Sequence, residues 1–169
     1  MISEKVKKKE KILAIGYGNT LRSDDGAGQI VATTVEAWNL PFARAIAIQQ
    51  LTPELAEDIS QAQLVIFIDA YPVDKNAQEN SLKIMRIFPN EEAGNFSAHV
   101  SDPRALLALS QTLYHHSPPA WWLLIPAVNF DFGEELSPIT SQGVAEALEQ
   151  IWRLLKSENF LTFEIDSRA

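Results

Sequence analysis

Five consecutive apolar residues in the middle of the chain, from Leu64 to Ile68, are followed directly by Asp69. The run does not alternate between apolar and polar residues, so it predicts a strand that is covered on both faces. Such strands are typical of parallel sheets flanked by helices. We therefore expect an α/β fold in which this strand is central and ends at Asp69.

Predicted strands and helices alternate on both sides of this central strand, as in a doubly wound α/β domain. The expected strands are at Ile12–Ile15, Ala45–Ile48, Leu82–Phe88 and Trp121–Ile125, the last closed by Pro126. The expected helices follow Asp24-Asp25 and end before Pro41, run from a Thr52-Pro53-Glu54 start to Ile59, open at Asp102-Pro103 and run to Leu113, and span Thr140–Leu155. The pattern predicts a three-layer α/β/α fold around a mostly parallel five-stranded sheet.

The strand at Leu82–Phe88 is the exception to this parallel pattern. The polar stretch from Pro72 to Ser81 is too short to hold a crossover helix. We therefore expect this strand to be an antiparallel edge strand.

Composition excludes several classes of protein. The chain has 169 residues, which suit one domain, and its 14 Lys and Arg against 22 Asp and Glu give a net charge of −8. An acidic chain is a poor partner for nucleic acid or an acidic membrane surface. With no cysteine, the chain has no disulfide, no thiolate metal site and no cysteine nucleophile. Any metal must sit on nitrogen and oxygen ligands.

The two ends of the chain differ from the core. We interpret residues 1–10 as a basic extension, residues 11–156 as the core of a single domain and residues 157–169 as a tail. The N-terminus lacks the apolar stretch of a secretory signal, and the longest apolar runs are too short to span a bilayer. We expect a cytoplasmic monomer.

Three side chains with reactive groups are expected at the carboxyl ends of the strands, where α/β folds bind ligands. Asp25 follows the first strand, Asp69 the third, and His99 precedes the helix at Pro103. Two carboxylates and an imidazole suit nickel, zinc or manganese, and they also suit acid–base catalysis.

Each of these residues also has a purely structural interpretation. Asp24 and Asp25 suit the cap of the following helix, Asp69 suits hydrogen bonds to loop amides, and His99 suits a surface loop. His115 and His116 suit the C-terminal end of a helix dipole. The pair Trp121-Trp122 is expected in the core.

The turn Gly16-Tyr17-Gly18-Asn19 suggests nucleotide binding, but Leu21 stands where the dinucleotide fingerprint needs a glycine. The chain also lacks a Walker lysine, a Gly-x-Ser-x-Gly elbow and a His-Glu-x-x-His helix. The sequence gives no support to a serine hydrolase or a zincin.

Taken together, the motifs resemble those of the hydrogenase maturation endopeptidases. The resemblance covers residues 11 to 155 and rests on four segments: Gly16 to Gly28 after the first strand, the apolar strand ending in Asp69-Ala70, Ser97-Ala98-His99 before a Pro-initiated helix, and Gly133 to Pro138 before the last helix. Some relatives have Glu at the position of Asp25, which would shorten the reach of this side chain by one methylene here.

The resemblance implies an aspartic-type endopeptidase that cleaves a short C-terminal extension from the large-subunit precursor of a nickel-containing hydrogenase. It implies that Asp25, Asp69 and His99 contact nickel delivered by the substrate, with Asp25 or Asp69 as the general base. It also implies that Gly18, Asn19 and Asp24 bind substrate. A Lewis-acid role for the metal is the competing mechanism.

Other functions remain open from the sequence. A non-proteolytic nickel-binding maturation chaperone would use the same three ligands without activating water. A nucleotide-binding regulatory domain and a broad-specificity endopeptidase of the same fold are further alternatives.

Overall fold

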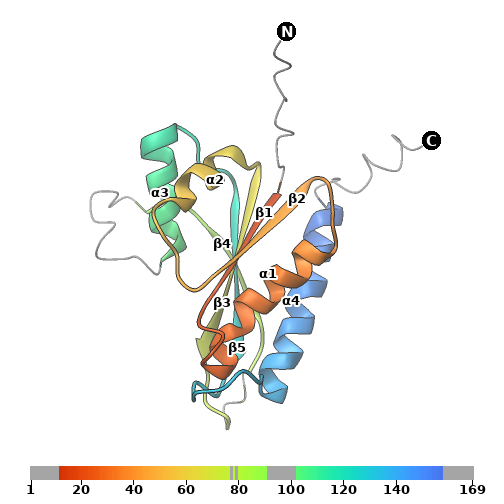
Figure 1. Ribbon diagram of the computed structural model, residues 1–169. Helices are drawn as coiled ribbons and strands as arrows, with labels where there is room; N and C mark the ends of the chain where they lie inside the picture. Colours follow the sequence, from red (N-terminus) through yellow and green to blue (C-terminus); the bar gives the residue numbers. More distant parts are fainter. Residues whose placement is uncertain (1–11, 77, 79, 91–101, 158–169) are drawn as a thin grey trace, which may run out of the picture.

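The computed structural model describes residues 12–76, 78, 80–90 and 102–157 (Figure 1). Its centre is one five-stranded sheet in the order β2-β1-β3-β5-β4. The strands are β1 (Ile12–Tyr17), β2 (Ala43–Ile48), β3 (Leu64–Pro72), β4 (Lys83–Ile87) and β5 (Ala120–Ala127). Four strands run parallel, and β4 pairs antiparallel with β5 at one edge. The predicted fold class and the antiparallel edge strand are both confirmed.

Helices cover both faces of the sheet (Figure 1). The helices α1 (Ala27–Ala37) and α4 (Pro138–Ser157) lie on one face, and α2 (Leu55–Gln61) and α3 (Pro103–Tyr114) lie on the other. A short 3-10 helix, η1 (Ser23–Gly26), connects β1 to α1. Figure 1 shows α2 and α3 toward the end of the sheet at which the chain enters β1.

The central strand β3 contributes to both cores. Ile66 and Ile68 pack in the cluster under α1 and α4, whereas Val65 and Phe67 pack in the cluster under α2 and α3. All four side chains are completely buried. This two-sided burial is the physical reason for the unbroken apolar run.

Two predicted strand ends are wrong. β3 does not end at Asp69 but continues to Pro72, because β5 pairs with it as far as Ala127. Pro126 does not close β5 but lies within it, opposite Tyr71. A proline is tolerated there because β4 reaches only as far as Leu124, so beyond that point no described residue pairs with the outer side of β5.

The helix starts are confirmed in part. Asp102 caps α3 by accepting a hydrogen bond from the Arg104 amide, and Pro103 occupies the first position. The helix α2 begins at Leu55, two residues later than the Pro53 start, and it has no side-chain cap. In α1, Val31 and Val35 are buried against the sheet, whereas Ile30 is 37% exposed.

None of the helices in the described ranges is both long and apolar enough to cross a membrane.

Candidate functional site

Asp69 and Tyr17 lie side by side on neighbouring strands. Gly16 of β1 is in register with Ile68 of β3, so the residues that follow them, Tyr17 and Asp69, lie opposite each other. By the alternation of side chains in a strand, both point to the face covered by α2 and α3. That face is less covered here, and Asp69 is half-buried.

Asp25 is brought to this site by the loop between β1 and α1. Its carboxylate accepts a hydrogen bond from the Asn19 backbone amide, at 2.8 Å. The Gln29 side chain donates to the Gly18 carbonyl at 2.6 Å. Gly18 has φ +139°, which a side chain disfavours, and a Cβ there would also collide with the Asp25 carbonyl. The turn therefore fixes Asp25 beside the end of β1.

The start of α1 packs directly on the sheet backbone. A Cβ on Gly28 would collide with the carbonyl oxygens of Ile68 and Tyr17. This close approach allows η1 to contact β3 near Asp69. Gly18 and Gly28 of the predicted motif thus help to place Asp25 and Asp69 at the same end of the sheet, where the parallel strands end.

The Asp69 carboxyl has an unusual environment. Its pKa is raised from 3.8 to about 6, mainly by burial and in smaller part by the negative charge of Asp25. The Ala70 amide, which donates to Asp69 Oδ1 at 2.8 Å, and the nearby Tyr17 hydroxyl work in the opposite direction. An aspartate with a pKa near neutrality can hold or release a proton, as general acid–base chemistry requires.

Two further polar groups lie beside Asp69. The Tyr17 hydroxyl and the Trp122 indole nitrogen are buried. Neither forms a hydrogen bond of ordinary geometry with any residue that the structure describes. Yet burial first, and then the charge of Asp69, raise the pKa of Tyr17, and Trp122 lowers it. We interpret the three groups as close neighbours with incomplete hydrogen bonds. Sequence analysis missed Tyr17, which only the β1–β3 register brings to Asp69.

Asp24 has a different place from Asp25. Its side chain is completely buried, and its carboxylate accepts hydrogen bonds from the amides of Val128, Asn129 and Ser137 and from the Ser137 hydroxyl, at 2.7–2.9 Å. Burial would raise its pKa, but these hydrogen bonds lower it overall. The carboxylate presents no exposed surface to a substrate, so the expected substrate contact is corrected to an anchor for the loop between β5 and α4.

The two loops are also joined through their backbones. The Ser23 amide donates to the Gly133 carbonyl at 2.7 Å, and the Gly133 amide donates to the Leu21 carbonyl at 2.9 Å. Ser23 has φ 51°, an uncommon conformation for serine, and its hydroxyl donates to the Asp131 carbonyl. Neither Asp24 nor Asp25 caps α1, so the capping interpretation is wrong.

Two of the three histidines lie within the described residues. His99 lies outside the described residues, so its expected place beside the two aspartates is untested. His115 ends α3 in a left-handed conformation, and His116 Nε2 lies 3.1 Å from the Ala62 carbonyl oxygen. Within the described ranges, no three acidic or histidine side chains gather closely enough to hold a metal ion. Asp25 and Asp69 are the two carboxylates of the described site.

Comparison with solved structures identifies the fold. It is shared with the [NiFe] hydrogenase maturation protease HybD from Thermococcus kodakarensis, at 22% identity and a TM-score of 0.61 over 85% of this chain and 98% of that chain. HybD from E. coli, a hydrogenase maturating endopeptidase, is 22% identical with a TM-score of 0.65 over 88% and 93%. HycI, a [NiFe] hydrogenase maturation protease from Thermococcus kodakarensis KOD1, is 18% identical with a TM-score of 0.60 over 89% and 95%. No family model and no curated protein matches the chain.

Proposed function

We propose that this chain, which has the fold of the hydrogenase maturation proteases, is an endopeptidase that removes a short C-terminal extension from a [NiFe]-hydrogenase large-subunit precursor. One observation carries the proposal. Asp25 and Asp69, separated by 43 residues of sequence, come together at the carboxyl edge of the sheet, and Asp25 contributes to the raised pKa of Asp69.

The two carboxylates would recognise nickel that the precursor carries. Two neighbouring negative charges repel each other, and a cation placed between the two carboxylates relieves that repulsion. Carboxylate oxygens and an imidazole nitrogen are acceptable ligands for nickel, and the substrate would supply the rest of its coordination. His99 is proposed as the third ligand on the resemblance alone. Only a nickel-loaded precursor would then dock in the register for cleavage.

Hydrolysis needs a base for the attacking water. We assign this role to Asp69, since its carboxylate would accept the proton while the water oxygen attacks the scissile carbonyl. The protonated carboxyl would then give this proton to the leaving amide nitrogen as the C–N bond breaks. Asp25, held by the Asn19 amide, would help to position the metal-bearing segment. These roles would make the protein an aspartic-type peptidase in which the metal positions the substrate.

Asn19 is the better candidate for direct substrate contact. The Gly18 amide and carbonyl already form hydrogen bonds within the described chain, and the Asp24 carboxylate is buried. The Asn19 carboxamide oxygen accepts from the Leu21 amide at 2.9 Å, which orients the amide and leaves its NH2 group for a peptide carbonyl.

A cleavage assay read by mass spectrometry tests the proposal. The full chain is mixed with nickel-loaded and nickel-free large-subunit precursor, and Asp25→Ala, Asp69→Ala and His99→Ala are run alongside. Asp131→Ala is the matched control, because this exposed side chain lies on the loop beyond the site. We expect one C-terminal peptide to be lost from the nickel-loaded precursor only, and only with the wild-type and control proteins.

Two other results would contradict the proposal. If the wild-type protein leaves every cognate precursor intact, the peptidase function is wrong. If it binds the loaded precursor tightly without cleaving it, the maturation chaperone becomes the better interpretation.

A further inference from the structure

We propose that the outer edge of β4, with the groove beside it, docks an extended segment of the substrate polypeptide as an additional strand. The segment would present an apolar side chain to the groove and an acidic side chain to Arg86. The inference rests on the proposed peptidase function and adds a second contact, away from the two aspartates.

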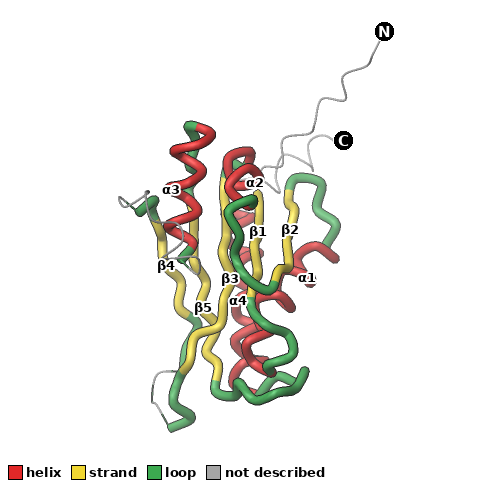
Figure 2. Tube along the Cα trace, turned by 60° about the vertical axis from the view of Figure 1, so that its left-hand side comes forward, coloured by secondary structure: helices red, strands yellow, loops and turns green. Residues whose placement is uncertain are grey.

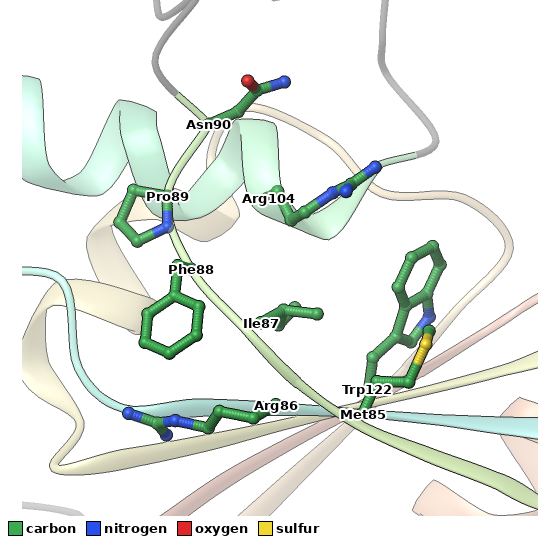
Figure 3. Close-up of a pocket in the computed structure, with 8 residues that line it drawn as sticks. All are labelled: Met85, Arg86, Ile87, Phe88, Pro89, Asn90, Arg104 and Trp122. Carbon is green, nitrogen blue, oxygen red and sulfur yellow. The ribbon is translucent and has the colours of Figure 1, made fainter.

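The groove lies between the end of β4 and the first turn of α3, and Figure 3 shows Trp122 on one side and Phe88 and Pro89 on the other. Its volume is about 560 Å³. Phe88 is 63% exposed and Met85 is 39% exposed, so apolar surface is open to a partner. The described lining contains two cations and no carboxylate: Met85, Arg86, Ile87, Phe88, Pro89, Asn90, Arg104 and Trp122.

The backbone of β4 is available for pairing on its outer side. Figure 2 shows β4 and β2 at opposite edges of the sheet, and within the described chain β4 pairs only with β5. Every second residue of an edge strand directs its N–H and C=O groups away from the sheet. At the other edge, the Glu36 carboxylate accepts a hydrogen bond from the Ala45 amide of β2 at 2.7 Å. No described carboxylate occupies the β4 edge in this way.

Cations on an edge strand often serve to prevent pairing, so their placement matters. The Arg86 guanidinium lies 5.2 Å from the Phe88 ring and 5.9 Å from the Trp121 ring, and Lys83 lies 4.4 Å from the Tyr71 ring. These rings hold both cations against the surface of the sheet and away from the edge backbone. They therefore do not block an added strand.

Charge favours an acidic segment. Arg104 is already paired with Asp102 at 2.7 Å, whereas Arg86 forms no ion pair with any described residue. In a chain with a net charge of −8, Arg86 is a local positive site at the rim of the groove, with its guanidinium on the Trp121 side of β4. A carboxylate on the docked segment would form an ion pair with Arg86.

The register relates this site to Asp69. Asp69 of β3 is opposite Leu124 of β5, which is opposite Lys83 of β4. A strand added outside β4 lies three strand spacings from β3, which is about 14 Å, or roughly four extended residues. The docked segment would therefore be at least about four residues from the scissile bond. Main-chain pairing of this kind supplies affinity, and the groove supplies specificity.

Because the docking site is remote from the metal, it should bind the nickel-free precursor as well. Amide hydrogen exchange is measured on the full wild-type chain with and without nickel-free large-subunit precursor, which is not cleaved. We expect exchange in β4 to slow by about tenfold or more, with no change in β2. We also expect Arg86→Ala to weaken precursor binding about tenfold, while Arg153→Ala, a matched arginine on α4, leaves it unchanged.

The possible failures are distinguishable. If the wild-type protein cleaves the loaded precursor but β4 exchange and the affinity of Arg86→Ala are unchanged, docking at β4 is wrong and the peptidase function stands. If no precursor is bound or cleaved, both proposals are wrong. The exchange measurement needs no substitution, so it does not depend on the folding of a variant.

Discussion

The Asp24 carboxylate accepts two hydrogen bonds from Ser137, one from its amide at 2.7 Å and one from its hydroxyl at 2.8 Å. The two residues are 113 positions apart in the sequence. Ser137 directly precedes α4, and its Oγ lies 3.4 Å from the amide nitrogen of Thr140. Ser137 thus helps to cap the first turn of α4. Asp24 thus connects the loop that carries Asp25 to the start of the last helix.

Asp24→Ala should therefore destabilise the whole fold. The amides of Val128, Asn129 and Ser137 would lose their acceptor in a buried place, and each unsatisfied amide costs about 1–3 kcal/mol. Allowing for partial relaxation, we expect a loss of about 3 kcal/mol in the free energy of unfolding, measured in urea. Asp131→Ala is the control and should change it little. An Asp24→Ala protein as stable as the control would contradict the anchoring role.

How far such an anchor could be predicted depends on which interactions are local. The buried strand Leu64–Ile68 and the Asp102-Pro103 helix start follow from neighbouring residues, and both are found. The partners of Asp24 come from a loop about 105 residues away, so local pattern suggested a helix cap instead. Asp is favoured at helix N-caps in general, but here the amides of a loop distant in sequence donate their hydrogen bonds to the Asp24 carboxylate.

The candidate site shows the same division. The motif placed Asp25 and Asp69 near the carboxyl ends of β1 and β3, as found. Tyr17 and Trp122 were outside the prediction because their nearness to Asp69 depends on strand register and on which face each side chain takes. An apolar run predicts a strand but not the length over which its neighbour pairs, which is why β3 was expected to end early.

The raised pKa of Asp69 predicts a pH dependence of stability in the metal-free protein. Between pH 3.8 and about 6, the folded chain keeps a proton on Asp69 that the unfolded chain has lost. Stability therefore falls as the pH rises through this window and levels off above it. Asp69→Asn removes this loss, so the variant should be more stable than the wild type at pH 8 by roughly 3 kcal/mol, and no more stable near pH 3.

Urea denaturation of both proteins across this range checks the sign. The informative quantity is the difference in unfolding free energy between Asp69→Asn and the wild type, because other titrating groups cancel in it. A difference that stays flat from pH 3 to pH 8 would show that the Asp69 carboxyl titrates normally.

Gly28→Ala should damage both the fold and the site. The new methyl group would collide with the carbonyl oxygens of Ile68 and Tyr17, which belong to the sheet backbone and cannot move aside as a flexible side chain can. Overpacking of this kind costs about 1–3 kcal/mol, and it would push η1 away from Asp69. At Gly26 the nearest atom to a new Cβ is Thr20 Cα, at 3.0 Å.

Gly26→Ala is therefore the matched control. Thermal unfolding should give a clearly lower Tm for Gly28→Ala than for Gly26→Ala. The chemical shift of the Asp69 carboxyl should move only in the first variant, as Asp25 is displaced. Equal Tm values would mean that α1 does not need the close approach at Gly28.

Nickel should bind the isolated protein weakly. The described site offers only the carboxylates of Asp25 and Asp69, and even with His99 the metal would depend on the substrate for its remaining ligands. We expect nickel added to the metal-free full chain to be lost on gel filtration, and to be retained when nickel-loaded precursor is present. Asp25→Asn and Asp69→Asn should each reduce the weak binding seen by isothermal titration. Stoichiometric nickel that stays with the protein alone would make it a resident metal, and the idea that the substrate's metal licenses cleavage would have to be abandoned.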